Sequence, residues 1–408
     1  MPGKLFRDSI HGDLRINDFE LQLIDSPVFQ RLRRIKQIGL NYLVYPGANH
    51  TRFEHSIGTM FLTSKLCDYL GLDAHEKDKL RVAALLHDVG HGPLSHVSEA
   101  LLDLPHEEAC REVLYNSTTA DLISKKFDCD EIIDIILGKG KLGPIISGEL
   151  DMDRMDYLMR DSHYTGVAYG VIDVERLISN FRLRKHLVLN IKGVQAAEAA
   201  LVARYFMYPI VYQHHTTRIA GSMVRRALRF CINESVIDAN DLFSMDDYDF
   251  INMLRSQEGF IKDIANRIDN RQLLKKVGSI NLNSFRNPND VYKISPELLR
   301  EAERNIADDM DIDENYIIIS IPKYPSFHEM KTQVEMDDKL YYLSDISSIV
   351  GNLRNARFNY ADLCIYVDEK YKSKFKDFEF SKYLDLPEES DKKTKYTHIN
   401  EIPLIPFD

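Results

Sequence analysis

Apolar residues recur every three or four positions over most of the first 270 residues, which is the spacing of amphipathic helices. This pattern predicts early helices over residues 52–70, 74–88, 107–115, 120–126 and 130–137. A further helix opens within residues 147–161. Later helices are predicted over residues 174–181, over 194–229 with an interruption near Pro209, and over 250–268.

The composition changes near residue 280, after which strand-like runs occupy residues 316–321 and 362–367. The expected fold class is therefore mainly α, with a helical core and a small mixed α/β C-terminal lobe. The chain is expected to divide into an N-terminal segment (1–50), a helical core (51–170), a helical extension (171–284) and the C-terminal lobe (285–408).

The composition is that of an ordinary globular protein, with 44% hydrophobic and 28% charged residues among 408. No apolar run is long enough to cross a bilayer and the N-terminus has no signal-peptide core, so we expect a cytoplasmic protein without a membrane partner. Five widely spaced cysteines predict neither a disulfide framework nor a cysteine zinc site. A net charge of −11 makes nucleic acid an unlikely partner.

Residues 80–96 hold the densest chemistry of the chain. An apolar helix brings His87 and Asp88 to its C-terminal end and is then broken by Gly90, Gly92 and Pro93. The i, i+4 pair His87 and His91 resembles the spacing of a helical zinc-protease motif, but the required glutamate and the unbroken helical turn are missing. The stretch therefore suits a divalent ion with phosphate-handling groups beside it.

Candidate metal ligands come from well-separated parts of the chain. They are His55, the adjacent His87 and Asp88, and a carboxylate of the Asp151/Asp153 pair. Two imidazoles with two carboxylates suit one divalent transition metal, and Fe, Mn, Zn, Co and Ni all fit this donor set. The spacing does not select among these metals.

The order His55, His87-Asp88, Asp153 reproduces the H…HD…D signature of the HD-domain metal-dependent phosphohydrolases. The runs R-F-E-H-S (52–56), H-D-V-G-H-G-P-L-S-H (87–96), D-M-D-R-M-D-Y (151–157) and Y-Q-H (212–214) resemble the deoxynucleoside-triphosphate triphosphohydrolase branch, which includes dGTPase-like enzymes. The resemblance is collinear from residue 4 to about residue 278. It implies an HD-domain helical core and the metal ligands His55, His87, Asp88 and Asp153.

The resemblance also implies residues for the substrate. Imidazole and guanidinium groups would contact the triphosphate, with His96 beside the α-phosphorus and His91 in proton transfer; the full set is Arg52, His91, His96, His106 and Arg154. Asp161 would accept a bond from the sugar 3′-hydroxyl, with a tyrosine packed where a 2′-hydroxyl would project. The nucleoside end would be held by Gln37, Tyr157, Asp161, Arg204, Tyr212 and Gln213.

Two regulatory nucleotide sites are implied as well. The first, for a guanine nucleotide such as GTP or dGTP, matches Lys4, Asp25, Gln30 and Arg33, although Arg7 replaces the usual Asn. The second is suggested by Val44, Lys192, Arg271 and Lys275, although Asn190 and Ala196 stand where basic residues are expected. Both sites lie at subunit contacts in the family. The match therefore implies a homotetramer, with Mg accompanying the nucleotides.

The expected activity is hydrolysis of a dNTP to deoxynucleoside and inorganic triphosphate, through a metal-activated water that attacks the α-phosphorus. One alternative is another HD phosphohydrolase, such as a nucleotidase or a phosphodiesterase. A second is a nucleotide-sensing HD protein without turnover. The sequence leaves open the preferred base, the native metal, the activator, the role of residues 285–408 and which histidine acts as general acid.

Overall fold

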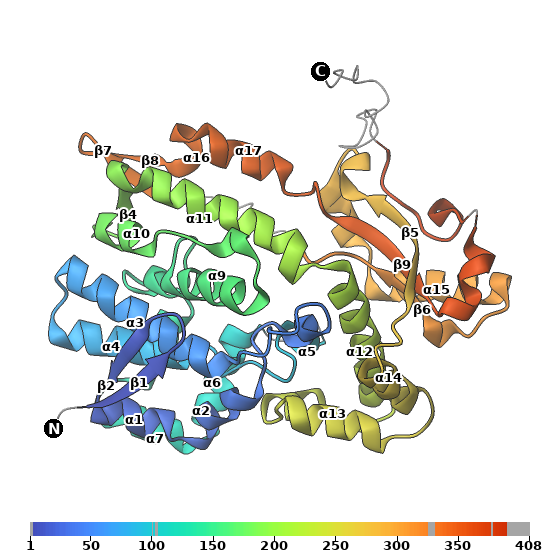
Figure 1. Cartoon of the computed structure of the whole chain (residues 1–408), viewed down its shortest axis with the longest axis horizontal. Coiled ribbons are helices and arrows are strands. Elements are labelled where there is room, and N and C mark those ends of the chain that lie inside the picture. The colour runs from blue at the N-terminus through green and yellow to red at the C-terminus, as the bar shows by residue number, and fades with distance from the viewer. Residues whose placement is uncertain (1–2, 100, 103–104, 325–330, 377, 390–408) are drawn as a thin grey trace.

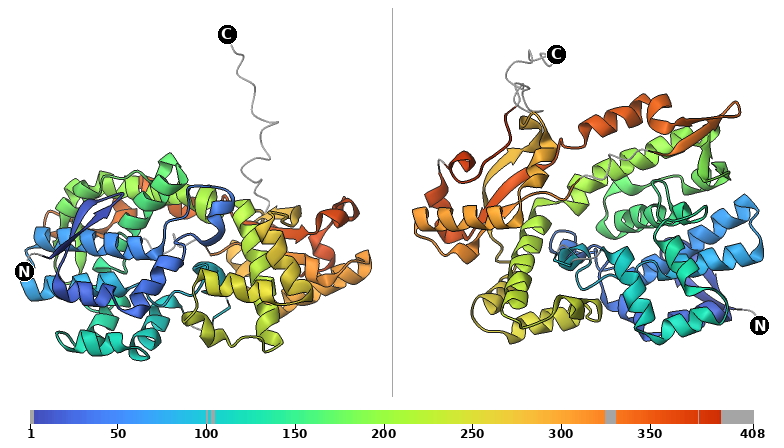
Figure 2. Two further views of the ribbon diagram at one scale, coloured as in Figure 1. Left: turned by 60° about the horizontal axis from the view of Figure 1, so that its bottom comes forward. Right: turned by 180° about the vertical axis from the view of Figure 1, so that it is seen from behind.

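The computed structural model describes residues 3–99, 101–102, 105–324, 331–376 and 378–389. It is mainly α-helical with small sheets, which confirms the predicted fold class (Figure 1). In the views of Figures 1 and 2, a large helical body and a smaller mixed lobe occupy the two ends of the molecule, with α12 running between them. Within the described residues, no helix is both long and apolar enough to span a membrane.

The helical body begins with a hairpin and continues as packed helices. Its helices in chain order are α1 (Asp18–Ile24), α2 (Pro27–Arg31), α3 (Arg52–Leu70), α4 (Ala74–Leu86), α5 (His96–Glu99), α6 (His106–Tyr115), α7 (Thr118–Ser124), α8 (Cys129–Ile136), α9 (Met152–Thr165), α10 (Val174–Asn180), α11 (Val194–Met207), α12 (His215–Asn233), α13 (Asp247–Ser256) and α14 (Gly259–Asp269). The remaining helices are α15 (Pro296–Met310), α16 (Leu343–Ile346) and α17 (Ser348–Ala356).

The strands form three separate sheets. The strands are β1 (Lys4–Asp8), β2 (Gly12–Ile16), β3 (Phe181–Leu183), β4 (Leu187–Asn190), β5 (Lys275–Asn281), β6 (Ile317–Ser320), β7 (Gln333–Met336), β8 (Lys339–Tyr342) and β9 (Asp362–Val367). The strand orders are β1-β2, β3-β4-β7-β8 and β5-β9-β6. The sheets are antiparallel except where β4 pairs in parallel with β7, with Leu189 opposite Val334.

Local signals account for where the helices begin and end. The α3 helix starts at a capping box of Thr51 and Glu54 and ends at Gly71, whose φ of +67° favours glycine. The predicted interruption near Pro209 is confirmed, because a short π-helical turn over Tyr208–Tyr212 separates α11 from α12. The single helix predicted over residues 250–268 is wrong. The chain breaks after Ser256 and restarts as α14.

The residues expected to form one C-terminal lobe are distributed over two places. The sheet β5-β9-β6 and α15 form the lobe, while β7, β8, α16 and α17 return to the helical body and lie along α11 in Figure 1. Val334, Leu343 and Val350 are buried in the same apolar core as α3 and α4. Residues 390–408 of the expected lobe lie outside the described residues.

The helical extension is fastened to the core by buried polar contacts. Asp247, at the start of α13, accepts hydrogen bonds from the backbone amides of Leu94 (2.6 Å) and Lys36 (2.9 Å). Arg31 of α2 donates to the carbonyl oxygens of Met245 (2.8 Å) and Val89 (2.7 Å). These contacts fix the turn after α4 against α13.

Gly58 sets how closely α3 and α9 approach each other. A Cβ atom at this position would overlap the Asp156 carboxylate and the Arg160 guanidinium, both of which belong to α9. α3 therefore needs a glycine here although glycine weakens a helix interior.

We expect Gly58→Ala to lower the free energy of unfolding by about 1–3 kcal/mol, because the added methyl group forces α3 and α9 apart. Gly351→Ala in α17 is the matched control. Its Cβ would meet the Ser344 carbonyl oxygen at an ordinary 3.4 Å, so this change should be neutral or stabilising by up to about 1 kcal/mol. Urea denaturation measures both, and a stabilised Gly58→Ala would contradict the packing described.

We expect Asp247→Ala to lower the free energy of unfolding by at least about 2 kcal/mol, because two buried backbone amides lose their acceptor. Tyr248→Ala, at the exposed neighbouring position, should change it by less than about 0.5 kcal/mol. Denaturant titration of the two variants provides the comparison. Equal stabilities would show that the Asp247 contacts contribute nothing.

Candidate metal centre and substrate site

The four ligand candidates meet where α3, α4 and α9 pack together. His55 lies on α3, His87 and Asp88 directly follow α4, and Asp153 lies in the first turn of α9. Oδ1 of Asp153 is 2.9 Å from His55 Nε2 and 3.6 Å from His87 Nε2. Asp88 carboxylate oxygens lie 3.7 Å from His55 Nε2 and 3.4 Å from His87 Nε2. Donor atoms of His55, His87 and Asp153 thus lie close enough together to hold one ion, and Asp88 adjoins both imidazoles.

Both imidazoles are oriented by their other nitrogen. His87 Nδ1 donates to the Ala84 carbonyl oxygen (2.8 Å), and His55 Nδ1 donates to Asp156 Oδ2 (2.8 Å). Each Nε2 therefore faces the site, where it would bind a metal after losing any proton that it carries. In the described part of the chain, neither buried Nε2 has a well-directed hydrogen bond. Two such imidazoles and two carboxylates fit a divalent transition metal.

The electrostatics of this point favour a cation. Burial alone would lower the pKa of His55, but the neighbouring carboxylates of Asp153, Asp156 and Asp88 raise it to about 10, so a metal that bound this ring would displace a proton. The pKa of Asp88 is held well below its usual range despite burial, because Arg52 and the neighbouring histidines stabilise its charged form. The carboxylates therefore remain charged around two buried imidazoles.

A second group of imidazoles lies beside the first. Glu99 accepts through one carboxylate oxygen from His96 Nδ1 and through the other from His106 Nδ1 (2.7 Å). His91 stacks on His106 with ring centroids 3.7 Å apart, and its Nε2 is 3.3 Å from Asp88 Oδ1. Burial and the charge of Arg52 lower the pKa of His91 well below its usual value, so this ring is neutral at pH 7. The His96 side chain is half exposed.

The turn that carries these histidines is strained. The predicted break after α4 is confirmed, and Gly90 is needed because a Cβ there would overlap the backbone of α6. The positive φ angles, however, fall on Leu94 (+54°) and Ser95 (+56°). Ser95 is held by its hydroxyl, which donates to the Lys36 carbonyl oxygen (2.7 Å) and accepts from Arg52 Nε (2.8 Å).

The two arginines predicted to contact phosphate already have protein partners. Arg52 is buried and donates through Nη1 to Asp88 Oδ2 (2.7 Å), so it orients a ligand candidate. Arg154 pairs with Asp151 and with the Gly148 carbonyl oxygen. Asp151 is the N-cap of α9 and accepts from the Arg154 amide (2.7 Å), which gives it a structural role.

Five of the six residues predicted for the nucleoside end lie on or next to α9, α11 and the π-helical turn, whereas Gln37 lies in the N-terminal segment. Tyr212 donates to Asp161 Oδ2 (2.8 Å), and its ring packs edge-on against Tyr157 with centroids 5.9 Å apart. Gln213 Nε2 donates to the Tyr212 carbonyl oxygen (3.2 Å). Among the residues described, buried Gln37 Oε1 has no hydrogen-bond partner. Arg204 is buried on α11.

The predicted regulatory residues fall into small groups. Arg33 Nε donates to Gln30 Oε1 (2.9 Å). Burial lowers the pKa of Arg33, and the negative charge of Asp25 opposes this by favouring the charged guanidinium. Lys4 is exposed on β1. Arg7 pairs with Asp13 across the hairpin (2.9 Å).

For the second site, Arg271 Nε donates to the carbonyl oxygen of Leu43, the neighbour of Val44 (3.0 Å). Lys275 faces Glu369 (3.5 Å). Lys192 belongs to the turn Ile191–Gly193, which packs against α10, α11 and β7.

Four residues around the site were not predicted. Asp156 and His11 lie behind His55, His50 Nε2 pairs with Asp161 Oδ1 (2.7 Å), and Glu99 joins two histidines. The i, i+3 spacing of Glu99 from His96 was a usable local signal. The other three depend on contacts between distant parts of the chain.

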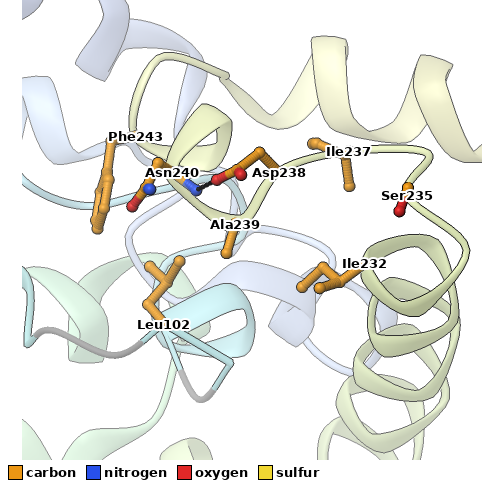
Figure 3. A pocket seen from close by; sticks show the side chains of 8 residues that line it. All are labelled: Leu102, Ile232, Ser235, Ile237, Asp238, Ala239, Asn240 and Phe243. Carbon is orange, nitrogen blue, oxygen red and sulfur yellow. Dashed lines mark hydrogen bonds between the residues drawn. The ribbon is translucent and has the colours of Figure 1, made fainter.

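A cavity of about 700 Å³ lies apart from this site, between Leu102 and the end of α12 (Figure 3). Three of its eight lining residues are polar, and Asp238 among them accepts from the Asn240 amide (2.8 Å) as a helix cap. The lining residues are Leu102, Ile232, Ser235, Ile237, Asp238, Ala239, Asn240 and Phe243. None of them was predicted for the reaction.

Comparison with known proteins agrees with this geometry. The HD domain matches residues 52–161, which contain all four ligand candidates, and the HD associated region matches residues 172–395. An uncharacterized protein of Methanocaldococcus jannaschii is 38% identical over 377 residues, which cover 90% of this chain and 80% of that protein.

More distant matches extend the comparison. The deoxynucleoside triphosphate triphosphohydrolase SAMHD1 homolog of Dictyostelium discoideum is 28% identical over 344 residues, covering 75% of this chain and 64% of that protein. The crystal structure of a hypothetical protein from Aquifex aeolicus matches with a TM-score of 0.75 and 31% identity, covering 91% of this chain and 98% of that chain. Together with the matched regions, these similarities show that the chain belongs to the HD-domain family of proteins with an HD-associated region.

Proposed function

We propose that this protein hydrolyses dNTPs to deoxynucleoside and inorganic triphosphate at a metal centre of His55, His87, Asp88 and Asp153. The observation that carries the proposal is the convergence of two oriented Nε2 atoms on Asp153 Oδ1, at 2.9 and 3.6 Å. The second group of imidazoles adjoins these ligand candidates, because His91 contacts Asp88. When bound, a divalent metal supplies positive charge that polarises water and a phosphate oxygen.

Other residues of the chain would contact the phosphate groups and transfer protons. Glu99 accepts hydrogen bonds from Nδ1 of His96 and of His106, so the half-exposed His96 can direct an unprotonated Nε2 toward the α-phosphate and accept a proton there. Neutral His91 contacts Asp88 through Nε2, and its Nδ1, which has no hydrogen-bond partner among the described residues, is the nitrogen that can exchange a proton with bound substrate. Arg52 and Arg154 add positive charge for the triphosphate and the departing anion.

The nucleoside end supports a preference for deoxyribose. Asp161 is already positioned by His50 and Tyr212, so one of its oxygens can accept a bond from a 3′-hydroxyl without rearrangement. The Tyr157 ring packs against Tyr212 and would fill the space that a 2′-hydroxyl needs. Gln37, Arg204 and Gln213 would complete the contacts.

We also propose regulation by a guanine nucleotide at Lys4, Asp25, Gln30 and Arg33, and assembly into a homotetramer, with Mg accompanying the nucleotides. The contact between Arg33 and Gln30 supports the first site, since amide and guanidinium groups can satisfy a guanine edge. We propose a second site at Val44, Lys192, Arg271 and Lys275, and the hydrogen bond from Arg271 to the neighbour of Val44 supports the pairing of these two residues.

The product identifies the reaction. With each of the four dNTPs under Mn²⁺, Co²⁺ or Mg²⁺, and with or without GTP or dGTP, we expect ion chromatography to detect inorganic triphosphate in equimolar amount with deoxynucleoside. Replacing both His87 and Asp88 by Ala should lower the rate by at least about 10³-fold, since the metal centre is lost.

Arg286→Ala, which removes an exposed ion pair with Glu388 in the lobe, is the control and should keep the wild-type rate. Release of monophosphate or pyrophosphate would instead assign the site to another HD phosphohydrolase. Full activity of the double variant would refute the metal assignment.

We expect Tyr157→Ala to loosen discrimination against ribonucleotides by roughly 10- to 100-fold in the ratio of kcat/KM values for dNTP and NTP, because a filled space becomes open. Tyr169→Ala, at a half-exposed position beside Phe206, removes the same side chain outside the site. Steady-state kinetics with matched dNTP and NTP pairs measures the ratio. An unchanged ratio in Tyr157→Ala would contradict the steric explanation.

A further inference from the structure

Asp156 is a fully buried carboxylate behind the metal centre, and four hydrogen bonds converge on it. Oδ2 accepts from His55 Nδ1 (2.8 Å) and Arg160 Nε (2.8 Å). Oδ1 accepts from His11 Nε2 (2.6 Å) and Arg160 Nη2 (3.0 Å). Since a carboxylate has about four lone-pair sites, its capacity as an acceptor is filled by these three residues.

The same cluster builds the tip of the β1-β2 hairpin. Arg160 also donates to both carboxylate oxygens of Asp8, at 2.9 and 3.3 Å. Asp8 Oδ1 in turn accepts from the amides of Ile10 (2.9 Å) and His11 (2.8 Å), which are in the turn of the hairpin. The hairpin is thereby connected to His55 by an unbroken series of hydrogen bonds through Arg160, His11 and Asp156.

We propose that the β1-β2 hairpin positions the metal ligand His55 through His11 and Asp156. The inference rests on the metal centre of the proposed function, but not on its substrate. A carboxylate that accepts from Nδ1 holds the imidazole plane and makes Nε2 a stronger donor to a metal. His11 also restrains Asp156, because it donates to Oδ1, the carboxylate oxygen that does not accept from His55.

The charges explain why this carboxylate can act on His55. Asp8 and Asp156 together face a single guanidinium, that of Arg160, so one negative charge is not neutralised by an arginine. The imidazoles of His55 and His11 are the groups that share it. Gly58 leaves the space in α3 that this arrangement requires.

The test measures metal binding by the full-length protein, after chelator treatment, with Co²⁺ as the probe. Competition with a chromophoric chelator gives the affinity, and visible absorption reports the geometry around Co²⁺. We expect Asp156→Asn to weaken Co²⁺ binding by about 10- to 100-fold and to change its spectrum. We expect His11→Phe, which removes one hydrogen bond and keeps an aromatic ring beside Phe61, to weaken it by about two- to tenfold.

Glu303→Gln is the matched control. Glu303 is also a buried carboxylate that accepts from arginines (Arg226, 2.5 Å, and Arg300, 3.2 Å), but it lies in the lobe. This variant should lose thermal stability and keep the wild-type affinity and spectrum for Co²⁺. His87→Ala, which removes a proposed metal ligand, shows the Co²⁺ affinity and spectrum to expect when the site itself is lost.

Wild-type affinity and spectrum in folded Asp156→Asn and His11→Phe would overturn the proposal, since the cluster would then be only structural. If Asp156→Asn does not fold, His11→Phe alone decides, because it removes one bond and leaves Arg160 in place. A wild-type protein that does not bind Co²⁺ would overturn both this inference and the metal centre. Binding of Co²⁺ without dNTP hydrolysis would overturn only the proposed substrate, and the variant comparison would still decide the inference.

Discussion

The close approach of α9 to α3 is the constraint on which the rest of the site depends. Because α3 has no side chain at Gly58, α9 lies near enough for Asp153 to reach His55 and His87. Three carboxylates, those of Asp88, Asp153 and Asp156, then surround two buried imidazoles. Arg52 and Arg160 compensate the charges of Asp88 and Asp156, and a divalent cation would compensate the rest.

Several residues connect the metal centre to its surroundings rather than acting alone. Arg52 contacts both Asp88 and Ser95, so one guanidinium orients a ligand candidate and holds a residue with a positive φ. Asp247 holds the neighbouring Leu94 from α13. The turn between the two groups of histidines is therefore fixed by long-range contacts, and its glycine at position 90 serves mainly the packing of α6.

The helical core was predictable because helical periodicity, a local signal, marks α3, α4 and α9. The ligand candidates followed instead from the H…HD…D order and its resemblance to a known family. The contact of His11 with Asp156 joins residues far apart in the chain, and side-chain pairs of this kind leave no pattern in a single sequence. Likewise, tertiary contacts impose the backbone angles of Leu94 and Ser95. The break between α13 and α14 was missed, although Gly259, with a φ of +60°, was a local signal for it.

The order of strands in the lobe has a consequence for how the nascent chain folds. In the sheet β5-β9-β6, the central strand is β9, which ribosomes make after both of its neighbours. Before that, β7 must return to pair with β4, and α17 must cover α11. The helical body therefore cannot finish folding until translation has passed Ala356, and the lobe cannot finish until translation has passed Val367.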